Sequence, residues 1–183
     1  MTDFVAENNE FAELEAFAKT CEGRSVNIIK LGGSSSSPCS DTYMGTKPAS
    51  EIEVSNLQNH ILSMKDRVKI FMDVHAYRQY WMYPYGYSTE LPEDDDDLYG
   101  ASRVAVQAIR ATHGKWFQYG SIANVIYVSS GSSVDWAYDV AGIKHSYALE
   151  LRDRGQYGFL SPRIRFNPRL KNSSLVQKLW SDI

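Results

Sequence analysis

The alternation of apolar and polar positions predicts several helices and strands along the chain. Residues 51–64 carry apolar side chains at helical spacing and predict an amphipathic helix. Residues 68–74 form an almost continuous apolar and β-branched run, which predicts a buried strand that ends beside His75. Further strands are predicted at residues 124–129 and 145–151. This mixed order of strands and helices indicates an α/β fold.

Two segments between these elements have unusual compositions. The aromatic stretch at residues 77–87 contains Pro84 and Gly86 and predicts an ordered loop or a short edge strand. The acidic run at residues 93–97 precedes apolar residues at helical spacing. We expect it at a helix N-terminus, where the helix dipole favours negative charge. A calcium site is the alternative, but the spacing of liganding oxygens expected for a calcium-binding loop is absent.

Both ends of the chain are also expected to carry secondary structure. Residues 2–9 predict a short helix, and residues 26–29 predict a strand that follows a turn. Residues 32–40 have the composition of a flexible loop. An apolar stripe that ends at Ile183 predicts a C-terminal amphipathic helix entered at Pro168.

Length, charge and composition limit the number of domains and the kinds of molecule that the chain is expected to bind. A chain of 183 residues is expected to form one domain. The net charge is −3 without a cluster of Lys and Arg, which argues against nucleic acid. No apolar run approaches the roughly 18 residues that cross a membrane, and the first residues lack the basic and apolar regions of a signal peptide. Aromatic residues make up 13% of the chain, which indicates either a filled core or an aromatic ligand-facing surface.

Two charged residues stand out as candidates for chemistry. His75 follows a predicted strand, and ligands gather at the carboxyl ends of strands in open α/β sheets. No histidine has a second ligand at the spacing of a local zinc site, so a structural role for His75 is the alternative. Glu150 interrupts an apolar strand, so its carboxylate must be paired, exposed at an edge, or catalytic. Arg152 and Asp153 follow it directly and offer a structural ion pair.

Four ordered segments resemble successive signatures of the zinc carboxypeptidases of the pancreatic A/B type. The segments are SSSSPCSDTYMG at 34–45, DVHAYRQYWMYPYGY at 73–87, YGSIANVIYVSSGSSVDWAY at 119–138 and GIKHSYALELRDRGQYGFL at 142–160. An early EGR turn at residues 22–24 is also similar to this family. The resemblance implies a mixed β-sheet flanked by helices.

The resemblance also implies roles for individual residues. His75 corresponds to the third ligand of the family's Zn²⁺ cofactor, and Glu150 to the general base that activates zinc-bound water. Tyr127 corresponds to a mobile tyrosine that closes over the terminal carboxylate of the substrate. The remaining substrate-binding positions are Tyr77, Val134 and Phe159. An apolar residue at position 134 implies an A-type preference for apolar or aromatic C-terminal residues of peptides and proteins.

Part of the family pattern is missing between Leu31 and Ser34. The H-x-x-E motif with two zinc ligands, the catalytic arginine and the Asn-Arg clamp are not found. We therefore expect one incomplete domain over residues 1–183, truncated by loss of central strands. It would comprise a helix and hairpin remnant at residues 1–31 and a C-terminal portion at residues 32–183. Such a sequence is typical of a truncated isoform, a fragment or an imperfect gene model.

Several expectations follow from this departure. The chain should bind Zn²⁺ weakly or not at all and should be inactive. The alternatives are a non-catalytic pseudoenzyme or peptide-binding fragment and a chain that does not fold stably. Cys39 should be a free thiol, unless it pairs with Cys21. The resemblance further implies an extracellular location, and we expect a monomer if the chain folds. From its net charge and the lack of a long apolar run, we expect it to bind neither nucleic acid nor membranes.

Overall fold

The computed structural model describes residues 37–39, 43 and 45–160 of the chain. The elements expected at residues 2–9 and 26–29, and the helix expected after Pro168, lie outside these residues. The chain forms two compact units, residues 1–65 and 66–183. In the first unit, helix α2 covers Ile52–Met64, so the predicted amphipathic helix is confirmed. Cys39 is exposed and forms no disulfide with a described residue.

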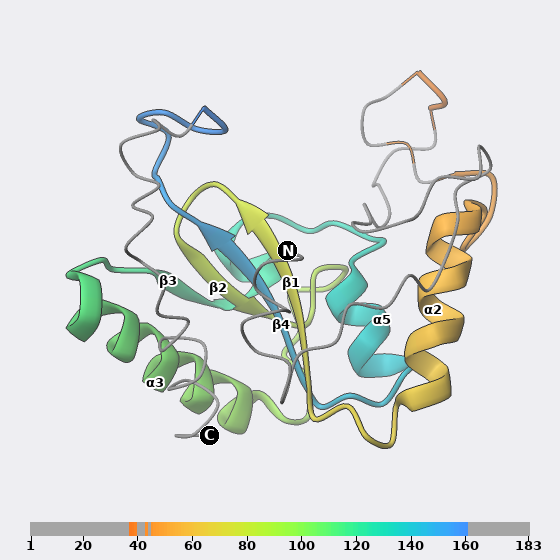
Figure 1. Ribbon diagram of the computed structural model, residues 1–183, viewed down its shortest axis with the longest axis horizontal. Coiled ribbons are helices and arrows are strands. Elements are labelled where there is room, and N and C mark those ends of the chain that lie inside the picture. The colour runs from red at the N-terminus through yellow and green to blue at the C-terminus, as the bar shows by residue number, and fades with distance from the viewer. Residues whose placement is uncertain (1–36, 40–42, 44, 161–183) are drawn as a thin grey trace, which may run out of the picture. The chain divides into compact units, whose positions relative to one another are not determined.

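The second unit is built on a four-stranded mixed sheet (Figure 1). Its strands, in chain order, are β1 at Ile70–Ala76, β2 at Tyr80–Tyr83, β3 at Gln118–Ser121 and β4 at His145–Leu151. The spatial order is β1-β4-β2-β3. Strand β4 pairs parallel with β1 and antiparallel with β2, and β2 pairs parallel with β3. The expected mixed sheet flanked by helices is thus confirmed.

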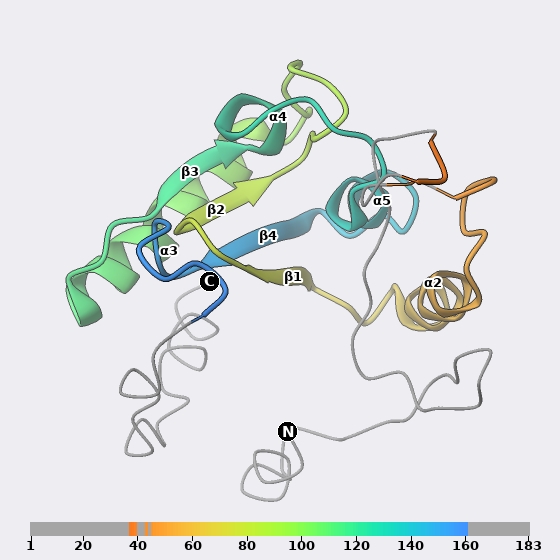
Figure 2. The same cartoon turned by 90° about the horizontal axis from the view of Figure 1, so that it is seen from above.

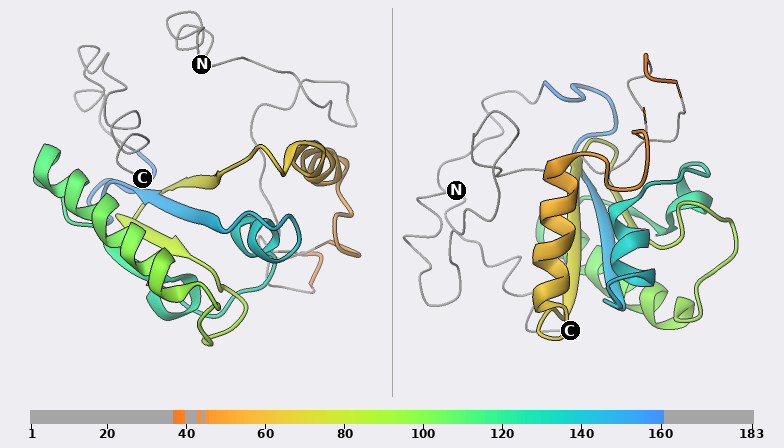
Figure 3. Two further views of the ribbon diagram at one scale, coloured as in Figure 1. Left: turned by 90° about the horizontal axis from the view of Figure 1, so that it is seen from below. Right: turned by 90° about the vertical axis from the view of Figure 1, so that its right-hand side faces the viewer.

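Helices cover both faces of this sheet. Helix α3 (Asp95–His113) runs along β2 and β3 on one face, as Figures 2 and 3 show from two sides. The short helices α4 (Ile122–Val125) and α5 (Ser133–Asp139) lie on the other face. Helix α3 ends where Gly114 adopts the left-handed conformation and its N–H bonds back to Arg110. No helix in the described part of the chain is long and apolar enough to cross a membrane.

The alternation of side chains along each strand divides the core into two layers. Trp81, Tyr83 and Tyr147 point towards α3 and pack with its buried face. The buried residues completing this layer are Leu98, Ala105, Val106 and Phe117. Met82 and Ala148 point to the opposite face. There they pack with Ile122 of α4 and Val134 of α5.

Strand β1 differs from its prediction in burial. A strand is present, but it begins at Ile70 and runs to Ala76, two residues beyond the predicted end. Met72 and Val74 are exposed, Val74 by 54%. Among the described strands β1 lies at the edge of the sheet, and α3 covers the β2 and β3 half instead. The prediction of a buried strand is therefore wrong, because an apolar run does not reveal which face is covered.

Two further predictions are corrected by the sheet. The aromatic stretch forms β2, which lies between β4 and β3 and is therefore not an edge strand. The strand predicted at residues 124–129 is absent, because α4 occupies Ile122–Val125 and a loop follows. The strand lies earlier, at Gln118–Ser121, where only four residues pair with β2. By contrast, the strand predicted at residues 145–151 is confirmed over its full length.

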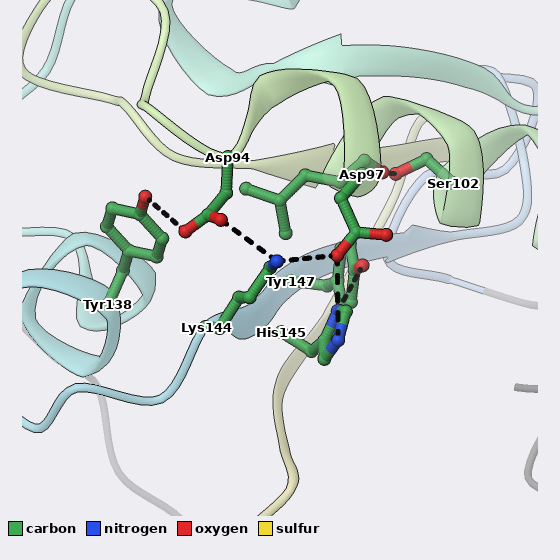
Figure 4. Close-up of polar contacts among 8 residues, drawn as sticks. Asp94, Asp97, Ser102, Tyr138, Lys144, His145 and Tyr147 are labelled. Carbon is green, nitrogen blue, oxygen red and sulfur yellow. Dashed lines mark hydrogen bonds and ion pairs between the residues drawn. The ribbon is translucent and has the colours of Figure 1, made fainter.

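A polar network joins the acidic start of α3 to the beginning of β4 (Figure 4). Lys144 Nζ lies 2.9 Å from Asp94 Oδ1 and 2.8 Å from Asp97 Oδ2. The hydroxyl of Tyr138 donates to Asp94 Oδ2 at 2.9 Å. These hydrogen bonds from Lys144 and Tyr138 lower the pKa of Asp94. The expected placement of the acidic run at a helix N-terminus is confirmed, and the carboxylates of Asp94 and Asp97 pair with Lys144.

Candidate functional site

The carboxyl ends of β1 and β4 bring His75 and Glu150 side by side. The two residues are direct partners in the parallel register of these strands. Tyr80 of β2 is the antiparallel partner of Glu150 on its other side. Because directly paired residues project from the same face, the three side chains form one row across three strands. This face is the one that α4 and α5 cover further along the strands.

His75 is held by a carboxylate from its own strand. Asp73 precedes it by two residues, so both side chains lie on one face of β1. Asp73 Oδ1 is 2.9 Å from His75 Nε2, and the hydroxyl of Ser133 in α5 donates to Asp73 Oδ2. Burial alone would raise the pKa of Asp73, but the hydrogen bonds from His75 and Ser133 lower it overall. The hydrogen bond to Asp73 in turn raises the pKa of the His75 imidazole.

Glu150 lies within the sheet with an incompletely satisfied carboxylate. Its Oε2 atom is buried and has no hydrogen-bond partner in the described part of the chain. Burial raises the pKa of Glu150, while the positive charges of His75 and Arg78 oppose this effect. Glu150 is not at an edge, because β4 is flanked by β1 and β2. Of the three alternatives that the sequence left open for Glu150, a buried carboxylate oxygen without a partner favours a functional role.

The implied zinc ion can be tested against the residues present. The chain has four histidines, all in described positions: His60, His75, His113 and His145. In the register, His145 pairs with Ile70, which places it about 16 Å from His75 along the strands. Among the described residues, no three His, Cys, Asp or Glu side chains form a group that could hold a metal. These residues therefore do not fit a zinc site by themselves.

Two aromatic side chains, the half-buried Tyr77 and the exposed Phe159, follow the carboxyl ends of β1 and β4. Tyr77 follows β1, and Phe159 follows β4 by eight residues. Their rings are 5.0 Å apart, edge to face, and Phe159 is 80% exposed. Tyr127 lies in the loop after α4 and is 65% exposed. The structure thus brings Tyr77 and Phe159 into direct contact, and leaves Tyr127 on a separate loop.

Val134 has a different environment from these aromatic residues. It is only 1% exposed and packs with Met82, Ile122 and Ala148. Its neighbour Ser133 is the residue that donates to Asp73. The side chain of Val134 is therefore part of the core on the same face of the sheet as the His75 and Glu150 row, further along the strands. Its role in a specificity pocket stays a prediction.

The sequence pattern does not single out Asp73 or Ser133 as parts of this region. For Asp73, the spacing of two residues from His75 on a strand is the signal that could have indicated it. Ser133 lies between the strands predicted at residues 124–129 and 145–151, and its contact with Asp73 spans 60 residues of chain. No local pattern contains such a contact.

Comparison with known proteins shows which sequence family the chain matches. Residues 29–174 match the sequence family described as zinc carboxypeptidase. Carboxypeptidase A1 of Homo sapiens is 46% identical over 148 residues, which is 80% of this chain and 34% of that protein. Carboxypeptidase B of Astacus astacus is 44% identical over 136 residues, which is 74% of this chain and 45% of that protein. The chain thus spans about a third to a half of these relatives.

Solved structures give the same result. Bovine thrombin-activatable fibrinolysis inhibitor, in complex with tick carboxypeptidase inhibitor, is similar with a TM-score of 0.73 and 34% identity. The match covers 82% of this chain and 53% of that one. Carboxypeptidase A from Helicoverpa armigera is similar with a TM-score of 0.67 and 27% identity, covering 80% and 36% respectively.

Proposed function

Because the chain belongs to the zinc carboxypeptidase family, we propose that it recognises the C-terminal ends of peptides or proteins, and that this 183-residue chain does not hydrolyse them. The proposed ligands end in an apolar or aromatic side chain. Tyr77, Tyr127, Val134 and Phe159 are the proposed substrate-binding residues.

One observation carries this proposal. The family's histidine and glutamate positions, His75 and Glu150, are partners in the register of adjacent parallel strands. The aromatic pair of the half-buried Tyr77 and the exposed Phe159 follows the ends of these strands. An apolar surface beside polar groups with shifted pKa values is typical of a binding site for a small ligand.

We propose that the chain does not hydrolyse peptides, because it has too few zinc ligands at the site. Catalytic zinc sites use three protein ligands. Among the described residues no three such side chains come together, and the Nε2 atom of His75 is paired with Asp73. We expect weak binding of Zn²⁺ by this chain. We propose zinc-dependent removal of C-terminal residues only for a longer protein that supplies the remaining ligands, in which His75 is a ligand and Glu150 the base.

The family also supports two proposals about the setting of the protein. We propose that it acts outside the cell and as a monomer. Binding to nucleic acid or membranes is not part of the proposal, since the net charge is −3 and no basic cluster is present.

The proposal is tested by calorimetry with short synthetic peptides. The purified chain is titrated with acetyl-Gly-Gly-Phe, acetyl-Gly-Gly-Arg and acetyl-Gly-Gly-Phe-amide. We expect binding of the first peptide, weaker binding of the second, and loss of binding for the amide, which lacks a terminal carboxylate. Equal affinity for all three would contradict recognition of a C-terminus.

Metal content and hydrolysis are measured on the same sample. Elemental analysis after dialysis with Zn²⁺ should give clearly less than one zinc per chain, and the peptides should remain intact. One chelator-resistant zinc per chain with release of Phe would show that the chain is an active enzyme. A denaturant titration with a cooperative transition verifies that the sample is folded.

A further inference from the structure

Asp135 is a buried carboxylate of α5 that the proposed function does not use. It lies in the first turn of this helix and is only 6% exposed. A buried carboxylate requires hydrogen-bond partners, because removing its charge from water is costly. The groups that bind Asp135 therefore show which part of the fold depends on it.

The partners of Asp135 are backbone N–H groups in the loop that follows β2. Gly86 donates to Oδ1 at 2.9 Å and to Oδ2 at 3.0 Å. Tyr87 donates to Oδ2 at 3.3 Å. Hydrogen bonds to an ionised acceptor are stronger than bonds between neutral groups. Asp135 thus fixes the backbone of this loop against α5.

The same loop holds the segment that carries Tyr127, which joins α4 to α5 (Figure 2). The carbonyl of Gly86 accepts the N–H of Ser129 at 2.7 Å. The carbonyl of Tyr85 accepts the N–H of Ala123 in α4 at 2.9 Å. Because Tyr127 lies between Ala123 and Ser129 in the chain, its segment is bound to the loop after β2 on both sides of the tyrosine.

Gly86 makes the link between Asp135 and Ser129 especially close. A Cβ atom built on Gly86 would lie 3.1 Å from the carbonyl oxygen of Ser129 and 3.2 Å from Oδ2 of Asp135. Both distances are shorter than ordinary van der Waals contacts, so the absence of a side chain at Gly86 permits this approach. The backbone of one residue therefore connects the buried carboxylate to the segment of Tyr127.

The exposure of this segment explains why it needs such a link. Ile126, Tyr127 and Val128 are all exposed. Exposed side chains gain little from packing, so packing does not repay the entropy lost when the segment takes one position. Hydrogen bonds at its ends supply this order instead, and a segment ordered in advance binds a ligand at lower cost.

The geometry points to Asp135 as the positioning residue that, through Gly86 and Ser129, holds Tyr127 where it contacts the terminal carboxylate of a bound peptide. The inference rests on the proposed function, in which Tyr127 is a substrate-binding residue. The side chain of Asp135 is buried and faces the loop after β2, so it acts through the backbone and does not itself touch the peptide.

The test is a double-mutant cycle on the full chain, with acetyl-Gly-Gly-Phe as the ligand. Affinities are measured for the wild type, Asp135→Asn, Tyr127→Ala and the variant with both changes. Asparagine has the shape of aspartate, but only its oxygen can accept a hydrogen bond. Asp96 is an exposed residue of α3, so Asp96→Asn is a control with the same change of charge. A pH of 7.5 keeps the wild-type carboxylate ionised, since the pKa of Asp135 is about 6.

We expect Tyr127→Ala to weaken binding about tenfold and Asp135→Asn about fivefold. The double variant should bind about as weakly as Tyr127→Ala alone, because Asp135 then has no tyrosine left to position. Asp96→Asn should bind like the wild type. If Asp135 had a purely structural role, the two losses would multiply to about fiftyfold, and this result would overturn the inference.

Hydrogen exchange separates this inference from the proposed function. Relative to the N–H of Val106 in the core of α3, the N–H of Ser129 should exchange at least about tenfold faster in Asp135→Asn than in the wild type. Unchanged protection of Ser129 would overturn the inference. If no form binds the peptide, the proposed function fails, and the exchange of Ser129 alone decides whether Asp135 holds this segment.

A second variant tests the same link if Asp135→Asn does not fold. Gly86→Ala adds a methyl group that would press on both Ser129 and Asp135. It should weaken binding of the peptide and speed the exchange of Ser129, as expected for Asp135→Asn. Wild-type affinity together with wild-type exchange in Gly86→Ala would overturn the inference.

Discussion

The carboxylate of Asp135 accepts the backbone N–H of Gly86 through both of its oxygens, at 2.9 and 3.0 Å. The N–H of Tyr87 also reaches Oδ2, at 3.3 Å. A residue of α5 therefore supplies the acceptor for the loop that follows β2. Burial disfavours the charged form and raises the pKa of Asp135 to about 6 despite these hydrogen bonds.

This raised pKa predicts a pH-dependent stability. The unfolded chain has the ordinary value near 3.8, so the folded protein binds more protons between about pH 4 and 6. The free energy of unfolding should therefore fall as pH rises through this window, by at most about 1.4 kcal/mol per pH unit from this group. Urea unfolding at several pH values should show this slope in the wild type and in Asp96→Asn, and lose it in Asp135→Asn. If the free energy of unfolding of Asp135→Asn depended on pH in the same way as that of the wild type, the pH dependence would come from other groups.

Substitutions of Val134 should change the stability of the protein, because this side chain is part of the core. Val134→Asp places a carboxylate among Met82, Ile122 and Ala148 and should cost about 3 kcal/mol or more of stability. Val134→Ala removes two methyl groups and should cost about 1–3 kcal/mol. Chemical denaturation at pH 7 gives both values. A Val134→Asp protein as stable as the wild type would mean that the side chain reaches solvent, as a pocket floor would.

Gly158 and Gly114 form a matched pair for testing the contact with Tyr77. Both glycines have positive φ, +58° and +65°, but a Cβ at Gly114 meets nothing within 4 Å. Gly114→Ala should therefore cost only the backbone strain, about 1 kcal/mol. Gly158→Ala pays this strain and also pushes against the tyrosine ring, so its loss of stability should be larger. Equal losses in the two variants would indicate that the loop moves freely away from Tyr77.

Glu150→Gln separates binding from catalysis in this chain. The substitution keeps the shape of the side chain and removes its charge, so the affinity for acetyl-Gly-Gly-Phe should change less than about threefold. Hydrolysis should stay at the background level before and after the change. Since burial disfavours the ionised carboxylate, the free energy of unfolding at pH 7 should rise. Turnover that depends on Glu150 would show that the chain is catalytically active.

The local pattern was sufficient for elements whose own sequence specifies them. Strand β4 has its predicted bounds, His145–Leu151, because the sequence of these seven residues is typical of a buried strand. Helix α3 follows an acidic first turn and ends at a glycine, both local signals. The motif resemblance likewise identified His75 and Glu150 as a candidate pair, because each lies in a characteristic stretch of sequence.

What only the tertiary structure decided depends on contacts between distant segments. The exposure of Val74 follows from the position of β1 at the edge of the described sheet, and the burial of β2 follows from its place between β4 and β3. The sequence determined that this protein has the motifs of a carboxypeptidase site. The fold decided that His75 and Glu150 are direct partners and that the carboxylate of Asp73 binds the His75 imidazole. The reason is that register and packing are set by pairing between strands that lie far apart in the chain.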